Sequence, residues 1–350
     1  MNGSKNVHIN HQFSESTDPT AVTRKSDHIE LAFRSQTDDN DKRFFYEPLF
    51  AAHPNNQDTW QVAFNNKILK FPIWISSMTG GTALAKTINY NLASACNEFG
   101  LGMGLGSCRQ LLTDQTYFQD FNVRPIMGDD LPLFANLGIA QLEQLIFQKQ
   151  LDKIIRLVES LQADGLIIHV NPLQEWLQPE GDRFQHPPIQ TIETILNYFP
   201  QLKIIVKEVG QGMGYHSLRH LLQLPLAAIE FAAFGGTNFA KLELLRSHTN
   251  ETQSFSAFAN VGHNATEMVE MVNNIVDELG DKITCKHVII SGGIKNCLDG
   301  FYLINRSKIN AIYGQASGFL KYAQGDYELL KQYISNETSG LLLAKAFLKI

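Results

Sequence analysis

The segment His169-Val170-Asn171-Pro172-Leu173-Gln174-Glu175 carries the densest set of side chains that could do chemistry. In an extended strand alternate residues share a face, so His169 and Asn171 lie on one face, with Gln174 and Glu175 in the following loop. The Gln174 amide can both donate and accept hydrogen bonds. The Glu175 carboxylate could ligate Mg²⁺, which proteins hold through one or two carboxylates together with substrate phosphates. The alternative for Glu175 is a solvated loop charge.

Lys207 and Glu208 form a second charged group, directly after the apolar run Ile204-Ile205-Val206. Neighbouring strand residues point to opposite faces, so one of the two should point toward the interior of the fold and the other into its wall. A buried lysine needs an anionic partner to keep its proton. A phosphate-bearing, electron-rich cofactor would suit this lysine, and an internal lysine–carboxylate pair is the alternative.

Two glycine-rich loops form a third group near the carboxyl terminus. Gly292-Gly293 and residues 314–318 are small enough for backbone N–H groups to approach an anion closely. These loops could hold a phosphate, and two ordinary glycine turns are the alternative.

All three groups stand at the ends of short apolar runs, most of them followed by a segment of helix length. Eight such runs follow one another, at residues 73–76, 100–103, 133–135, 166–170, 203–206, 227–231, 287–290 and 311–313. Continuous apolar strands that alternate with helices indicate a parallel sheet covered on both faces. Eight units predict an α/β fold, a closed (β/α)₈ TIM barrel with its active site at the carboxyl ends of the strands.

The chain before the barrel divides into two segments. Residues 1–23 are polar and predict a flexible tail, and residues 24–70 predict an arm that ends in a hairpin over 59–70, turning at Asn65-Asn66. Within the arm, residues 29–34 resemble a helix. Residues 71–350 form the expected barrel domain.

Composition limits the classes of function. The 350 residues include 29 Lys and Arg against 35 Asp and Glu, so the net charge of −6 disfavours nucleic-acid binding. The sequence has no signal-like segment and no long apolar run, and its four cysteines match neither a zinc site nor a disulfide framework. These features predict a cytoplasmic protein without a membrane partner.

The ordered motifs resemble those of the type 2 isopentenyl-diphosphate isomerases. The His169 segment continues into the family's signature through Trp176-Leu177-Gln178-Pro179-Glu180-Gly181-Asp182. The other pieces follow in family order, namely Arg24-Lys25 with Asp27-His28, Met78-Thr79-Gly80-Gly81, Ser107-Cys108-Arg109, Asn136-Leu137-Gly138, Val206-Lys207-Glu208-Val209-Gly210, Gly235-Gly236-Thr237 and Ser291-Gly292-Gly293-Ile294.

The resemblance implies an enzyme that interconverts isopentenyl diphosphate and dimethylallyl diphosphate. It implies reduced FMN and Mg²⁺ as cofactors, NADPH as flavin reductant, and a homotetramer or homo-octamer. Glu175 would hold the metal, and Gln174 would act with the flavin N5 in catalysis. By matching positions, the residues that bind FMN would be Ser77, Met78, Thr79, Ser107, Asn136, Lys207, Thr237, Gly292, Gly293, Ala316 and Ser317. Those that bind substrate would be Arg24, Lys25, Ser107, Arg109, His169, Asn171 and Gln174.

Three positions depart from the family pattern. Cys108 replaces a common Gln, Asn238-Phe239 replaces Ser-Trp, and Lys295 replaces Arg. Phenylalanine keeps an aromatic face, whereas lysine loses the planar fork with which arginine grips phosphate.

Other functions fit the same barrel. An FMN oxidoreductase of the 2-hydroxy-acid oxidase type would need a catalytic His and an Arg, and His263 lacks the expected His-Gly-Gly-Arg context. An inosine-monophosphate dehydrogenase-like enzyme would need a nucleophilic cysteine in a glycine-rich loop, which neither Cys285 nor Cys297 matches. A barrel that binds phosphate without turnover would be colourless on purification.

Overall fold

The computed structural model describes residues 20–55, 57–77, 79–80, 82–246 and 252–350. The chain separates into two compact units, Met1–Phe44 and Phe45–Ile350. The hairpin therefore belongs to the same unit as the barrel. The predicted functional division at residues 23 and 70 stays a proposal.

The N-terminal unit contains the helix α1 (Ala21–Leu31). The predicted helix over 29–34 was wrong in both its start and its end, because α1 begins eight residues earlier and ends at Leu31. Neither Gly nor Pro interrupts this segment, so nothing in its backbone chemistry prevents an earlier start. Arg24 and Lys25 consequently lie on a helix. Residues 1–19 of the predicted tail lie outside the described residues.

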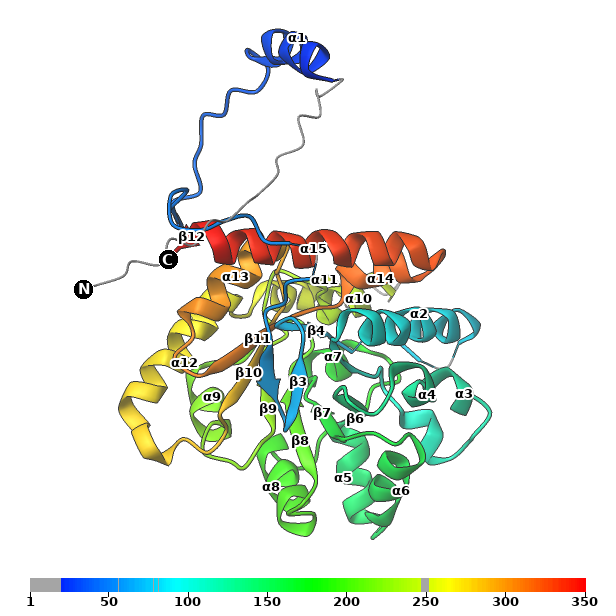
Figure 1. The fold of residues 1–350 in the computed structure, drawn as a ribbon. Coiled ribbons are helices and arrows are strands. Elements are labelled where there is room, and N and C mark those ends of the chain that lie inside the picture. Colours follow the sequence, from blue (N-terminus) through cyan, green and yellow to red (C-terminus); the bar gives the residue numbers. More distant parts are fainter. Residues whose placement is uncertain (1–19, 56, 78, 81, 247–251) are drawn as a thin grey trace, which may run out of the picture. The chain divides into compact units, whose positions relative to one another are not determined.

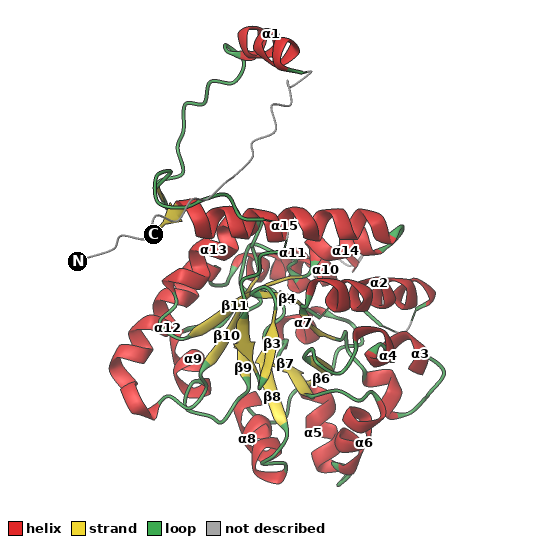
Figure 2. Ribbon diagram, viewed as in Figure 1, coloured by secondary structure: helices red, strands yellow, loops and turns green. Residues whose placement is uncertain are grey.

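Eight parallel strands in the described part of the chain close into a barrel (Figures 1 and 2). They are β4 (Ile73–Ile75), β5 (Gly102–Gly104), β6 (Leu133–Gly138), β7 (Gly165–His169), β8 (Lys203–Lys207), β9 (Ala228–Glu230), β10 (His287–Ser291) and β11 (Asn310–Gln315). Each strand pairs with the next, and β11 pairs with β4 to close the ring. Each strand overlaps one of the eight predicted runs, so the predicted TIM barrel is confirmed.

Helices surround the strands (Figure 2). The longer ones are α2 (Ala83–Phe99), α5 (Ile139–Phe147), α6 (Asp152–Ser160), α8 (Pro188–Tyr198), α10 (Phe239–Arg246), α12 (Ala265–Leu279), α13 (Cys297–Arg306) and α15 (Tyr327–Phe347). The shorter ones are α3 (Phe118–Phe121), α4 (Arg124–Met127), α7 (Pro172–Leu177), α9 (Tyr215–Leu221), α11 (Thr252–Phe255), α14 (Ser317–Ala323), η1 (Arg109–Leu112), η2 (Ser256–Asn260) and η3 (Gly280–Lys282).

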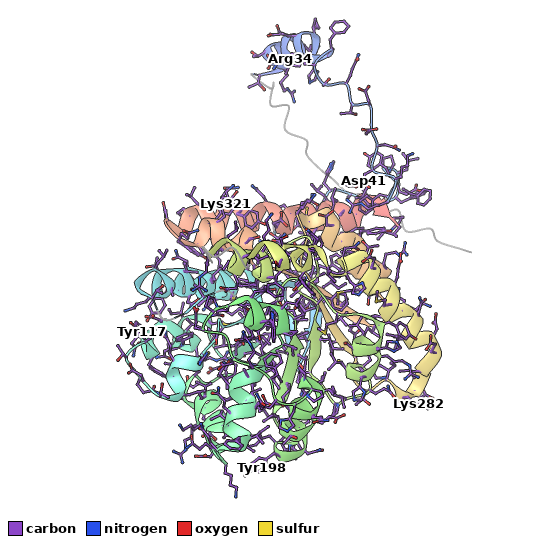
Figure 3. All side chains as sticks on the ribbon, turned by 180° about the vertical axis from the view of Figure 1, so that it is seen from behind. Arg34, Asp41, Tyr117, Tyr198, Lys282 and Lys321 are labelled. Carbon is purple, nitrogen blue, oxygen red and sulfur yellow. The ribbon has the colours of Figure 1, made fainter. Side chains whose placement is uncertain are left out.

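The helix α12 illustrates how sequence fixes these elements. Asn264 accepts a hydrogen bond from the backbone N–H of Glu267, and the Glu267 side chain accepts one from Asn264, which is a capping box. The stripe Met268, Val272 and Ile275 is buried against the barrel wall at helical spacing. Figure 3 shows side chains densely placed around the ribbon, and Trp74, Phe134 and Tyr313 of the barrel strands are fully buried.

The hairpin of β2 (Val62–Phe64) and β3 (Lys67–Leu69) is confirmed, with its turn at Asn65 and Asn66. Both turn residues have positive φ, 51° and 66°, which a two-residue type I′ turn requires. Phe64 is fully buried, with its ring 5.5 Å from those of Trp74 and His287, near the amino ends of β4 and β10. The hairpin therefore closes the amino end of the barrel and leaves the carboxyl end for a ligand.

A two-stranded sheet pairs β1 (Phe45–Tyr46) with β12 (Leu348–Lys349) beside the end of α15. Among the described residues, no helix has both the length and the apolar character that crossing a bilayer demands.

Candidate active site

A cavity of about 340 Å³ opens at the carboxyl ends of the barrel strands. Its walls come from the loops after β4, β8, β9, β10 and β11. Seven of the residues predicted to bind FMN line it: Ser77, Lys207, Thr237, Gly292, Gly293, Ala316 and Ser317. Met78, which was also predicted, lies outside the described residues.

The loop after β10 presents bare backbone to this cavity. Gly292 and Gly293 have positive φ values of 91° and 75°. A Cβ atom at Gly292 would lie 2.1 Å from the carbonyl oxygen of Ala233, so a side chain there would force two loops apart. Glycine at these positions lets the loops after β9 and β10 meet closely and leaves backbone groups at the cavity wall.

Lys207 ends β8 and is buried, and it lines the cavity. Its Nζ donates to the carbonyl oxygen of Glu208 at 2.9 Å, and no ion pair of Lys207 is found within the described residues. The register partner of Lys207 on β9 is the buried Glu230, and the two side chains form no ion pair. Burial of a cation without an ion pair is costly, so this ammonium group favours an anion in the cavity. The predicted alternative, a lysine–carboxylate pair inside the barrel, is not observed among these residues.

Glu208 faces away from Lys207, toward a separate cavity beside α8 and α9, as the alternation of a strand predicts. Its Oε2 accepts backbone N–H bonds from Gly210 and Gln211, each at 2.6 Å, and from Gly212 at 3.1 Å. Burial raises the pKa of Glu208, and these N–H donors oppose the rise. Glu208 therefore orders the loop after β8.

His169 ends β7 and connects the neighbouring strands. Its Nδ1 lies 2.7 Å from Oδ1 of Asn136, whose Nδ2 donates to Ser77 Oγ at 3.0 Å. Burial, and then the nearby charge of Lys207, lower the pKa of His169 to about 3, so the imidazole is neutral at physiological pH. With Nδ1 donating to Asn136, Nε2 remains a hydrogen-bond acceptor. Three predicted site residues thus form one network.

Asn171 precedes α7 and joins the next pair of predicted residues. Its Nδ2 donates to Gln174 Oε1 at 3.1 Å and to Glu175 Oε1 at 3.0 Å. Its Oδ1 is buried and has no partner among the described residues. Buried polar atoms are normally satisfied, so this oxygen marks a place where a ligand or water donor fits.

Glu243 on α10 belongs to the site and was missed by the sequence analysis. The Gln174 Nε2 donates to Glu243 Oε1 at 3.3 Å, and Arg246 donates to Oε2 at 2.6 Å. The Glu243 side chain is only 2% exposed. A glutamate in a short helix of mixed polarity is normally interpreted as a surface charge. The available signal was that this helix begins two residues after Thr237 of the Gly235-Gly236-Thr237 loop.

Glu175 is the predicted metal ligand. Its Oε1 accepts from Asn171, and its Oε2 accepts from the backbone N–H of Asp182 at 2.7 Å. The described residues contain no group of three or more His, Cys, Asp or Glu side chains that could hold a metal ion. The donor set therefore suits Mg²⁺ only as a single carboxylate that shares the ion with substrate oxygens.

Arg109 and Ser107 lie in the loop after β5 and are exposed. The Arg109 guanidinium pairs with Asp182 at 3.3 Å, which brings it to the same segment as Glu175. Thr79 packs against this loop, since a Cβ atom added at Gly106 would lie 2.4 Å from the carbonyl oxygen of Thr79.

The three departures from the family pattern have different surroundings. Cys108 is fully buried, and burial raises the pKa of its thiol to about 12, so it packs as an inert side chain. Phe239 and Lys295 both line the cavity. Arg24 and Lys25 lie on α1 of the N-terminal unit, and their contact with substrate stays a prediction.

No protein-family model matches the sequence. Among solved structures, a variant of flavocytochrome b2 with pyruvate bound has a TM-score of 0.59 at 11% identity, covering 87% of this chain and 72% of that one. A mandelate oxidase variant with an FMN adduct has a TM-score of 0.53 at 12% identity, covering 88% of each chain. Both likenesses show the fold alone.

Curated relatives are much closer in sequence. The isopentenyl-diphosphate delta-isomerase of Rickettsia africae (strain ESF-5) is 36% identical over 321 residues, and that of Rickettsia bellii (strain RML369-C) is 35% identical over 321 residues. The matches cover 89% of this chain and 89% of each relative. The chain therefore belongs to the isopentenyl-diphosphate delta-isomerase family, in agreement with the type 2 motifs of its sequence.

Proposed function

We propose that this chain interconverts isopentenyl diphosphate and dimethylallyl diphosphate, using reduced FMN and Mg²⁺. The observation that carries the proposal is Lys207, a buried cation that faces the cavity and makes no ion pair within the described residues. Beside it stand the His169–Asn136 and Asn171–Gln174 hydrogen bonds. The relatives' name supplies the substrate class.

The residues that line the cavity favour FMN by their charge and by their small size. Lys207 would favour the anionic reduced flavin by placing positive charge near its N1 and C2 carbonyl. The loops of Gly292-Gly293 and of Ala316-Ser317 follow the last two barrel strands, where many TIM barrels hold a phosphate. The mandelate oxidase variant of the same fold holds an FMN adduct, which supports the choice of flavin.

Substrate binding combines basic residues with a metal ion. Arg109 reaches the Asp182 segment and is exposed enough, at 56%, to turn toward a diphosphate. Arg24 and Lys25 would add two further positive charges, and Glu175 would share Mg²⁺ with the diphosphate. Anchoring the diphosphate fixes the short hydrocarbon close to the acid and base, which supplies much of the catalytic advantage.

The reaction moves a double bond by adding a proton at one carbon and removing one from another. When bound, reduced FMN supplies the proton-transfer chemistry through its N5. Gln174 orients the alkene end and relays the proton, and Glu243 holds the amide of Gln174 in place through its hydrogen bond. The neutral His169 keeps an acceptor at Nε2 for the substrate.

The test is isomerase turnover with dithionite-reduced FMN and Mg²⁺. Absence of product with flavin properly bound would refute the proposal, and bleaching of the flavin by lactate or glycolate without isomerisation would support an oxidase. Gln174→Asn should abolish activity while keeping the flavin absorbance. Gln178→Asn is the matched control, because Gln178 donates to Glu180 at the exposed end of α7. Equal turnover of the two variants would remove Gln174 from the mechanism.

Further parts of the proposal concern the whole protein. NADPH would reduce the flavin, and the chain would act as a cytoplasmic homotetramer or homo-octamer without nucleic-acid or membrane partners. Residues 24–70 would serve the substrate and residues 71–350 would bind FMN.

A further inference from the structure

Tyr333, on the C-terminal helix α15, lines the same cavity as the glycine loops after β10 and β11. α14 and α15 lie side by side at the C-terminal end of the chain (Figure 1). Neither the motifs nor the family resemblance assigns a role to this helix.

The hydroxyl of Tyr333 lies at the loop after β11, and Gln315 links it to the loop after β10. It donates to Oε1 of Gln315 at 2.9 Å, and Nε2 of Gln315 donates to the carbonyl oxygen of Ile294 at 3.4 Å. A Cβ atom at residue 318 would lie 2.8 Å from this hydroxyl, so Gly318 leaves the room that Tyr333 occupies. The hydroxyl therefore reaches the region where a phosphate is expected in this fold.

The ring of Tyr333 is fixed by its neighbours. Tyr322 stacks on it with ring centroids 4.7 Å apart and planes at 23°, and Phe319 meets it edge-on at 5.7 Å. A donor held in place in advance loses little conformational entropy when a ligand binds. Burial, followed by the charge of Glu337, raises the pKa of Tyr333, so the hydroxyl keeps its proton at physiological pH.

The charges around the glycine loops also favour a neutral donor. Lys295 is the one charged side chain that the loops after β10 and β11 bring to the cavity, among its described lining residues. A phosphate monoester carries about −1.5 to −2 charges near pH 7 and three acceptor oxygens. Backbone N–H groups and hydroxyls must then satisfy most of those oxygens.

We propose that the Tyr333 hydroxyl donates a hydrogen bond to the phosphate group of FMN, which makes α15 part of the cofactor site. The inference rests on the proposed use of FMN. A tyrosine hydroxyl carries one proton, so its donation to phosphate replaces the bond that it donates to Gln315 Oε1, while Gln315 Nε2 keeps its bond to the Ile294 carbonyl oxygen. Tyr333 thus distinguishes FMN from riboflavin, which has the same ring system without the phosphate.

The test compares FMN and riboflavin binding to flavin-free protein by quenching of flavin fluorescence. Tyr333→Phe should weaken FMN binding about 10- to 100-fold, the range of a hydrogen bond to a charged group, and leave riboflavin binding unchanged. Tyr322→Phe is the matched control, since it removes a hydroxyl from the stacked neighbour, which does not line the cavity, and should change neither affinity. Gly318→Ala should imitate Tyr333→Phe by displacing the hydroxyl.

Each other outcome overturns the inference. Unchanged FMN binding by Tyr333→Phe means that the hydroxyl does not contact the phosphate. An equal loss for FMN and riboflavin means that Tyr333 only supports the shape of the cavity. Wild-type protein that binds no FMN refutes the proposed function itself, and that result is visible before any variant is made.

Discussion

Glu337 on α15 predicts a pH-dependent loss of stability that a single substitution removes. Its carboxyl group is buried and accepts from the Tyr313 hydroxyl at 3.3 Å. Burial raises the pKa of Glu337 from 4.5 to about 7, the Tyr313 hydrogen bond opposes this rise, and the charge of Asp299 adds to it. The folded protein therefore holds a proton that the unfolded chain releases at lower pH.

The sign and size follow from proton linkage. Stability is fully present below pH 4.5 and falls as the pH rises through about 7, because the folded state must then carry a buried negative charge. The difference between the two pKa values corresponds to about 3 kcal/mol of unfolding free energy at pH 8. Glu337→Gln keeps the shape of the side chain and removes this cost.

Urea unfolding at pH 5 and pH 8 measures the effect. Relative to wild type, Glu337→Gln should gain about 2.5 kcal/mol more at pH 8 than at pH 5. Glu159→Gln on α6 is the control, because Glu159 is exposed and its substitution should shift both values equally. A Glu337→Gln difference that is the same at both pH values would refute a raised pKa at this position.

Three further predictions test other parts of the molecule. Phe64→Ala should lower the unfolding free energy by about 3–5 kcal/mol in urea titrations, because the substitution leaves an empty space beside Trp74. A loss below about 1 kcal/mol would contradict the inference that the hairpin closes the amino end of the barrel. Glu243→Gln should reduce isomerase turnover at least about tenfold and spare flavin absorbance, since Gln174 loses a charge-assisted partner. Lys207→Gln should lower the midpoint potential of bound FMN in spectroelectrochemical titration, because the anionic reduced flavin loses a nearby positive charge. An unchanged potential would mean that Lys207 does not lie near the flavin ring.

The sequence predicted the barrel because its strands are buried on both faces and read as unbroken apolar runs. Within the predicted run 166–170, for example, Leu166, Ile167 and Ile168 are fully buried in β7. Asn65-Asn66 predicted the hairpin for an equally local reason, since asparagine tolerates the positive φ of the turn. Such signals lie within a few residues, so no knowledge of tertiary contacts was needed.

The contributions of the helices could not be predicted in the same way. Glu243 stands 69 positions from Gln174, and Tyr333 stands 18 positions from Gln315, and each pair meets only because a helix packs with one particular face inward. The extent of α1 was also missed, because a polar helix has no apolar stripe to mark its start. In a barrel the carboxyl ends of all strands meet at one end, so the position of Lys207 and His169 at strand ends is enough to predict that they belong to the site. A helix residue reaches the site only if it lies on the face that packs inward, and the sequence does not show which face that is. For this reason the two residues added to the predicted site, Glu243 and Tyr333, both lie on helices.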